Sequence, residues 1–175
     1  MSMRRGDVLA SGVEQSAVLM GRYLAGFDDN SRVAQTPGLP NHAAWTLGHL
    51  AYVLHRAAER VDGHPLPKTD FIEGAKDGDA NHYGQESVAL GSVVTAEPER
   101  YPTWDRCQVI FEASLKRFCH VLRHASDAEL DAPRDWGANK TTAHDLASRM
   151  VFHVGTHTGQ LIDLRRALKM SKVVG

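Results

Sequence analysis

The order of apolar and polar residues along the chain predicts four long amphipathic helices. In each of them apolar side chains recur at steps of three and four residues, which places them on one face of a helix. The predicted helices span residues 7–27, 41–61, 102–125 and 141–169. No segment alternates convincingly between apolar and polar residues, so no strand is predicted. Four helices of this length predict an all-α protein folded as a four-helix bundle.

Local signals mark where these helices begin and end. Asp7 is a candidate N-cap of the first helix, and Thr141 or Thr142 can cap the fourth, because side-chain oxygens accept hydrogen bonds from the first backbone N–H groups of a helix. Gly63 is a strong stop signal for the second helix. A further short helical turn is predicted over residues 126–130.

The connection between the second and third helices is unusually long. It comprises residues 64–101 and is rich in Gly, Asp, Asn and Pro, whereas bundle helices are usually joined by about two to eight residues. Residues 86–90 predict one short helical turn within it. Such a link can cross the bundle end and change the simple up-down order of the helices. It is either a surface crossover or a lid over a pocket.

Length and charge exclude several classes of protein. A chain of 175 residues is expected to form a single domain, residues 1–175. With 20 Lys and Arg against 21 Asp and Glu, the chain has no broad basic field, so no nucleic-acid partner is expected. The uncharged stretch between Arg32 and Arg56 holds two prolines and three histidines and is a poor membrane span. Asp7 and Glu14 interrupt any signal-peptide core, which predicts a cytoplasmic protein.

The two cysteines do not form a site of their own. Cys107 and Cys119 lie twelve residues apart on one predicted helix, so a rise of about 18 Å separates them, beyond the reach of a disulfide. The chain contains no Cys-x-x-Cys motif, and neither a thiolate zinc site nor a redox dithiol has support. Both cysteines are predicted to be small core residues.

Two histidines occupy the apolar face of the fourth predicted helix. Its stripe runs through Leu146, Met150, His153, His157, Leu161, Leu164 and Leu168. Imidazoles four residues apart are neighbours on a helix and can hold one metal ion. His120 and His124 have the same spacing, but each lies two residues beyond an apolar position, about 200° around the helix. This second pair is predicted to face water.

A third metal ligand must come from another helix, and His49 is the best candidate. It lies in the middle of the second predicted helix, beside Gly48, which would allow another segment or a ligand to come close. His55 is rotated by about 120° from His49 and is expected to face elsewhere. His42 is about 10.5 Å away along the axis, too far to share an ion but near enough to line a pocket.

The motifs of two common metal sites are absent. Val154 follows His153, where the His-Glu-x-x-His metalloprotease motif has its glutamate base. Paired Glu-x-x-His motifs of di-iron bundles are also absent from the sequence. A single divalent ion bound by three neutral imidazoles fits better, and Zn, Ni, Co, Fe or Mn could occupy such a site. The alternative is a set of hydrogen-bonded core histidines.

Four residues near these histidines are candidates for a substrate pocket: His42, Trp45, Arg149 and Gln160. Gln160 could orient a bound water or substrate, or it is a packing amide. Trp45 is a pocket wall or a core residue, and Arg149 attracts a substrate carboxylate or is an exposed side chain. His42 is a general base, or it caps a helix or faces solvent. No carboxylate stands out as a base, so no catalytic residue is predicted.

Particular motifs give the chain a family resemblance. They are Gly48-His49-Leu50 within residues 41–50, Tyr101-Pro102-Thr103, and His153-Val154-Gly155-Thr156-His157-Thr158-Gly159-Gln160. Over about residues 7–168 the chain resembles the DinB-like (YfiT-like) metal-binding four-helix bundles. The resemblance implies a metal site made by His49, His153 and His157, a long link between helices 2 and 3, and a homodimer. The Gly- and Asp-rich stretch around residues 73–84 departs from the family pattern.

The resemblance also bears on function, because characterised relatives include thiol-dependent S-transferases and a mycothiol-dependent maleylpyruvate isomerase. Three protein ligands leave a coordination position for water or substrate, as in catalytic sites. The first hypothesis is a metal-dependent enzyme that acts on a small molecule, by S-transfer or related chemistry with a low-molecular-weight thiol. The alternatives are a metal-dependent hydrolase, a non-catalytic metal-binding or stress-response bundle, and an interaction module without metal.

Overall fold

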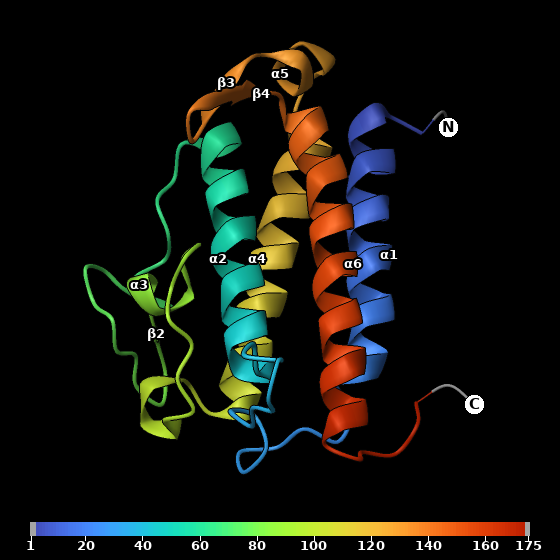
Figure 1. Cartoon of the computed structure of the whole chain (residues 1–175). Helices are drawn as coiled ribbons and strands as arrows, with labels where there is room; N and C mark the ends of the chain where they lie inside the picture. Colours follow the sequence, from blue (N-terminus) through green and yellow to red (C-terminus); the bar gives the residue numbers. More distant parts are fainter. Residues whose placement is uncertain (1–2, 174–175) are drawn as a thin grey trace.

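Four long helices form the frame of the protein. A computed structural model describes residues 3–173. The long helices are α1 (Arg5–Leu24), α2 (Ala43–Asp62), α4 (Trp104–His124) and α6 (Ala143–Ala167). Their apolar faces meet in one continuous core, and Figure 1 shows the four helices side by side. The predicted all-α four-helix bundle is confirmed.

The helices do not follow a simple up-down order. In Figure 1, α1 and α6 run downward, whereas α2 and α4 run upward. Each of α1 and α2 packs against both α4 and α6. The neighbours α2 and α4 are therefore parallel, which requires the chain to return along the length of the bundle between them. The long link makes this return, so its predicted effect on helix order is confirmed.

The link lies against the outer side of α2 (Figure 1). It contains β1 (Phe71–Ile72) and β2 (Tyr83–Gly84), which form a two-residue parallel pair, then α3 (Gln85–Val88) and the 3-10 turn η1 (Pro98–Arg100). The α3 turn corresponds to the one predicted near residues 86–90. The strands were not predicted, because two residues are too few to produce an alternating pattern.

Tyr83 fastens the link to α2. Its side chain is fully buried, and its hydroxyl donates a hydrogen bond of 2.8 Å to the carbonyl oxygen of Ala44. The ring lies over Gly48, where an added Cβ atom would come within 2.4 Å of the Tyr83 Cε1 atom. Gly48 predicted a close approach by another segment, and the link makes it at the residue directly before His49.

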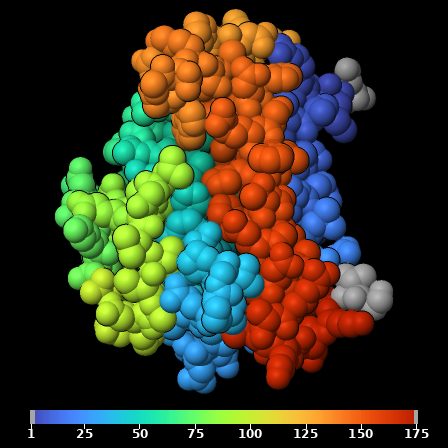
Figure 2. All heavy atoms as spheres, viewed as in Figure 1, coloured from blue at the N-terminus to red at the C-terminus, as the bar shows by residue number. Residues whose placement is uncertain are grey.

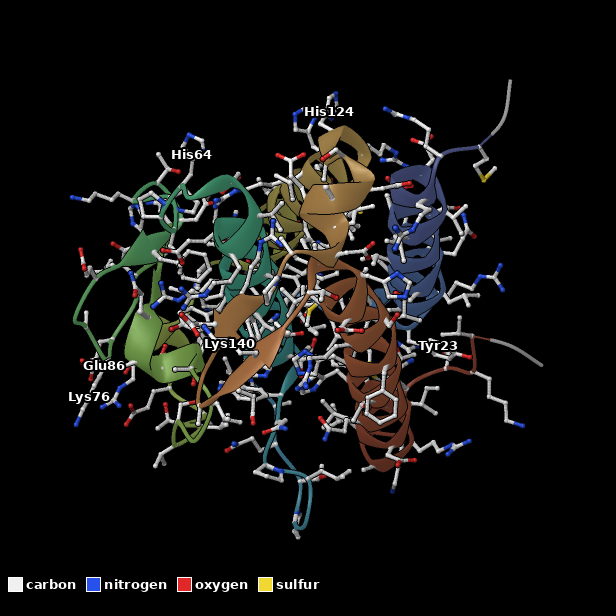
Figure 3. The ribbon with its side chains drawn as sticks, turned by 90° about the horizontal axis from the view of Figure 1, so that it is seen from above. Tyr23, His64, Lys76, Glu86, His124 and Lys140 are labelled. Carbon is white, nitrogen blue, oxygen red and sulfur yellow. The ribbon has the colours of Figure 1, made fainter. Side chains whose placement is uncertain are left out.

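The connection between α4 and α6 covers one end of the bundle (Figure 1). It contains α5 (Asp127–Asp131) and an antiparallel hairpin of β3 (Arg134–Trp136) and β4 (Asn139–Thr141). Ser126 caps α5, which confirms the predicted short turn. The hairpin was not predicted, because three-residue strands also carry too little pattern. Seen from above, the hairpin with Lys140 lies over the end of the bundle (Figure 3).

Two predicted helix boundaries are wrong, and local hydrogen bonds explain why. The Asp7 carboxylate accepts the N–H of Arg4 at 3.2 Å from inside the helix, so α1 begins before Asp7 rather than at it. The helix ends at Leu24, since Gly26 has a φ of 85°. Phe27 nevertheless stays in the core, which extends the apolar pattern beyond the helix. Thr142 caps α6, as one of the two candidates predicted.

The two cysteines lie in the core, as predicted. Cys107 and Cys119 are both fully buried. Burial raises the pKa of each thiol to about 12, so neither is a thiolate at neutral pH. In the part of the chain that the structure describes, no helix combines the length and the apolar character that crossing a membrane would require.

Candidate metal centre

Three histidines from two helices converge inside the bundle. The Nε2 atom of His153 lies 3.2 Å from Nε2 of His49 and 3.0 Å from Nε2 of His157. One ring nitrogen from each histidine lies within 4.8 Å of the other two. Over residues 3–173, this is the only group of three or more His, Cys, Asp or Glu side chains close enough to hold a metal ion. The structure therefore brings together the three histidines that the sequence singled out.

The register of each helix places these rings. His49 is 4% exposed and His157 is 6% exposed, whereas His153 is partly exposed. On α6 the stripe continues through the buried side chains of Met150 and Leu161, on either side of the pair. The two helices pack against each other, so a ring on the inner face of α2 meets both rings of α6. The partial exposure of His153 leaves one side of the cluster open.

Hydrogen bonds hold two of the rings in a defined tautomer. The Nδ1–H of His49 donates to the carbonyl oxygen of Val88 at 2.8 Å. The Nδ1–H of His157 donates to Oε1 of Gln160 at 2.8 Å, and the amide of Asn41 donates to the same oxygen at 3.2 Å. A proton on Nδ1 leaves the Nε2 lone pair free on each neutral ring. Such outer hydrogen bonds typically orient histidines that bind metals.

The arrangement of the Nε2 atoms fits a divalent cation. If His153 carried its proton on Nε2, it could donate a hydrogen bond to only one of its two neighbours at a time. The Nε2 lone pair of the other neighbour would then have no donor. A cation would attract all three lone pairs. In a tetrahedral zinc site with Zn–N bonds of about 2.0–2.1 Å, two nitrogens lie about 3.4 Å apart, close to the 3.2 and 3.0 Å that separate Nε2 of His153 from the other two rings.

Burial keeps the imidazoles neutral. Burial, together with positive charge on the neighbouring rings and on Arg149 beside His153, lowers the pKa of both His153 and His157 to about 4. Burial also lowers the pKa of His49, against the effect of its hydrogen bond to Val88. Neutral rings at pH 7 can bind a metal ion without first losing a proton.

Trp45 packs directly on the cluster. Its ring stacks on that of His49, with centroids 4.7 Å apart and an angle of 6° between the planes, and its edge meets His157 at 5.9 Å. The Nε1–H donates to the carbonyl oxygen of Ser87 at 2.9 Å and to Oγ of Ser92 at 3.0 Å. Trp45 thus shields the histidines on the side of the link and fixes the link to α2.

A cavity of about 530 Å³ adjoins the histidines. It lies between α2, the link near residue 90, the hairpin and α6, which meet on the face shown in Figure 2. Its lining is made by His49, Tyr52, Val53, Arg56, Arg60, Leu90, Trp136, Gly137, Arg149, Met150, Phe152 and His153. Arg149 is the one residue of the four predicted for a substrate pocket that lines it. Trp45 and Gln160 contact the histidines instead.

His42 is buried away from this cavity. Its Nδ1 atom accepts the N–H of Trp45 at 3.1 Å, and its Nε2–H donates to the carbonyl oxygen of Thr95 at 2.9 Å. The predicted helix cap is confirmed, whereas exposure to solvent is wrong because the link folds over this helix end. With both nitrogens in hydrogen bonds, His42 is poorly placed to act as a general base.

The sequence interpretation missed several residues that line the cavity. Arg56 and Arg60 continue the stripe of His49 and Val53 at steps of four, three and four, so helical spacing could have revealed them. Trp136 comes from an irregular connection, where no periodic signal exists. His55 faces elsewhere, as predicted, and its Nδ1 accepts a hydrogen bond of 3.2 Å from Arg117.

Comparisons with known proteins agree with this architecture. A family model described as the DinB superfamily matches residues 14–161. A crystal structure of a conserved protein from Enterococcus faecalis superimposes with a TM-score of 0.68 at 14% identity, over 94% of this chain and 97% of the other. This similarity concerns the fold alone. None of the curated proteins matches the chain. Because the family model covers most of the helical bundle, we conclude that the chain belongs to the DinB superfamily.

Proposed function

We propose that the protein is a metal-dependent enzyme that acts on a small molecule, with thiol-assisted group transfer as its reaction. One observation carries this proposal: three neutral imidazoles direct their Nε2 atoms at one another beside a cavity. His49, His153 and His157 would hold the ion. Because His49 and His153 also line the cavity, a fourth ligand could enter from that side, which is typical of catalytic rather than structural sites.

The chain supplies position and shielding around the ion. When bound, a divalent ion would lower the pKa of a coordinated thiol or water and so provide a nucleophile at neutral pH. Val88 and Gln160 hold two of the rings in place, and Trp45 covers the cluster on one side. A substrate that enters from the cavity would therefore meet a nucleophile in a fixed position.

The lining of the cavity favours a thiol over water as the nucleophile. No Asp or Glu is among the lining residues, so the cavity offers no carboxylate to act as a general base. Metal-assisted hydrolysis commonly relies on such a base, as in the His-Glu-x-x-His enzymes. A free thiol has a pKa of about 8.5, far below that of water, so on binding an ion it would release its proton to solvent without a carboxylate base, which supports transfer chemistry ahead of the hydrolase alternative.

The proposal is tested by turnover. Untagged protein would be loaded with Zn, Ni, Co, Fe or Mn and incubated with low-molecular-weight thiols, glutathione among them, and a panel of electrophiles. We expect thiol consumption that needs the ion and is lost in His153→Ala but retained in His120→Ala. Turnover of esters or amides without thiol would favour the hydrolase. Tight metal binding without either activity would favour a non-catalytic bundle.

We also propose that two copies of the chain form a homodimer through α1 and α6. Val8 and Leu19 are both about half exposed and lie on one stripe of α1, at 53% and 52% exposure. A Cβ atom added to Gly12, on the same stripe, would lie 3.7 Å from Val151 of α6, which extends the apolar surface. Sedimentation should show a dimer that Leu19→Glu weakens, whereas a wild-type monomer would contradict the proposal.

A further inference from the structure

We infer that the cavity beside the three histidines binds small organic acids. Arginines of the cavity would hold the oxyanion of such an acid, and apolar side chains would contact its aromatic or aliphatic body. The inference rests on the proposed function and names its substrate class. Three of the twelve lining residues are arginines, Arg56, Arg60 and Arg149, and none is acidic. Guanidinium groups bind carboxylates and phosphates through paired hydrogen bonds.

Two of these arginines form no close ion pair. Over residues 3–173, neither Arg60 nor Arg149 forms an ion pair. Asp135 of the hairpin pairs with Lys140 at 2.5 Å, and the charge of Arg60 makes only a smaller contribution to the lowered pKa of its carboxyl. Arg56 pairs with Glu59 at 2.8 Å, and its guanidinium carbon lies 5.5 Å from the centroid of the Tyr52 ring. The cavity therefore keeps positive charge that a bound anion would compensate.

The arginines lie on the same side of the histidines. On α2, Arg56 and Arg60 follow His49, whereas on α6 Arg149 precedes His153. Because the two helices run in opposite directions, both sets lie toward the end of the bundle that carries the hairpin (Figure 1). Along the helix axes, Arg149 lies about 6 Å from His153 and Arg56 about 10.5 Å from His49. The oxyanion would thus lie several bonds from the atom that meets the histidines.

The remaining lining residues suit an apolar body. The cavity has an apolar wall between the arginines and the histidines, made by Tyr52, Val53 and Met150. On the side of the hairpin, Trp136 lines the cavity. At the rim, Leu90 is 94% exposed and Phe152 is 76% exposed. Large apolar side chains with this exposure, gathered around a cavity, mark a surface that a ligand would cover.

Calorimetric titration with matched ligands tests the inference. The probes are 4-phenylbutyrate, its uncharged amide and 2-phenylethyl phosphate, added to zinc-loaded and to zinc-free protein. We expect the acid to bind at least tenfold more tightly than the amide, and the phosphate arm shows which oxyanion is preferred. Arg149→Gln and Arg60→Gln should each raise the Kd of the acid roughly tenfold, which equals about 1.4 kcal/mol. Arg22→Gln, an exposed arginine outside the cavity, should leave it unchanged.

The outcomes separate this inference from the proposed function. Equal binding of acid and amide, no binding of either anion, or an unchanged Kd in both cavity variants would overturn the inference. Zinc binding would be unaffected by such a result, and the metal-dependent reaction could still stand. Conversely, selective anion binding by a protein that shows no metal-dependent turnover would support the inference and contradict the proposed function.

Discussion

Two pairs of histidines have the same spacing in this protein but lie in opposite surroundings. His153 and His157 lie on the inner face of α6, with their Nε2 atoms 3.0 Å apart and His49 of α2 beside them. His120 and His124 lie on α4 and are both exposed, with ring centroids 4.0 Å apart. His124 projects away from the bundle in Figure 3. The i, i+4 spacing alone therefore does not make a metal site.

The difference lies in what surrounds each pair. The exposed pair has solvent on one side, and the Nδ1–H of His124 donates to the carbonyl oxygen of His120, within its own helix. The inward-facing pair meets a third ring from a facing helix, and the Gln160 amide accepts a hydrogen bond from one of its members. Position on the apolar stripe and a donor from another helix distinguish a candidate centre from an ordinary surface pair.

Removing one ring from each pair should sharpen this comparison most. His153→Ala leaves two of the three proposed ligands, so metal affinity should fall by more than about a hundredfold, beyond the effect usual for an outer hydrogen-bond partner. His120→Ala should leave the affinity unchanged. Metal content after dialysis of the untagged variants gives the result, and equal content in both would contradict the role assigned to the inward-facing pair.

The hydrogen bond behind His157 should have the next largest effect. Gln160→Leu removes the acceptor of the Nδ1–H of His157, so the ring can rotate or change tautomer. We expect metal affinity to fall by roughly ten- to a hundredfold. Gln160→Glu keeps an oxygen acceptor and should retain most of the affinity. If competition with a chelator gives the same affinity for Gln160→Leu and wild type, Gln160 is only a packing residue.

Acid should destabilise the metal-free protein through its buried histidines. Burial lowers the pKa of His42 and of His55 to about 4, from about 6.5 in an unfolded chain. Between these two pKa values the unfolded state binds more protons than the folded state. The contribution of the neutral histidines to the free energy of unfolding is therefore fully present above about pH 6.5 and is lost as the pH falls toward 4. At pH 5 each of these two histidines would lower the free energy of unfolding by about 2 kcal/mol relative to neutral pH. Urea denaturation at pH 7.5 and pH 5 measures this loss, and equal midpoints would contradict it.

The contact between Gly48 and Tyr83 should show how far the site depends on the link. In Gly48→Ala the new methyl group would overlap the Tyr83 ring, so we expect a loss of about 1–3 kcal/mol in the free energy of unfolding, with weaker metal binding. Gly155→Ala on α6 is the matched control, because nothing lies within 4 Å of its added Cβ atom. That exposed change should stabilise the helix by up to about 1 kcal/mol. Equal stability of the two variants would contradict the account.

The fold was predictable where one pattern extends over many residues. The stripes of α1, α2, α4 and α6 each repeat over about twenty residues, and they predicted the bundle and the place of the long link. The strands β1 to β4 have two or three residues each, too few for a period to appear. The misplaced start of α1 depended on local hydrogen bonds between Asp7 and both the backbone and the side chain of Arg4, which composition does not reveal.

The candidate site was predictable in part for the same reason. The three histidines His49, His153 and His157 each lie on a long apolar stripe, so their inward orientation could be inferred. The family resemblance indicated that they form one metal site. The roles of Val88, Gln160 and Trp136 depend on tertiary packing. In particular, the carbonyl oxygen of Val88 carries no signal in the sequence that would connect it with His49, which lies on a different element.

X-ray absorption at the zinc edge tests the central claim most directly. The untagged protein would be loaded with one equivalent of zinc, with His120→Ala as control. We expect one tightly bound ion per chain, with three imidazole nitrogens at about 2.0–2.1 Å and at least one further light-atom ligand from solvent. The same spectrum is expected for the control. A spectrum with fewer than three imidazoles, or with a thiolate ligand, would contradict the account.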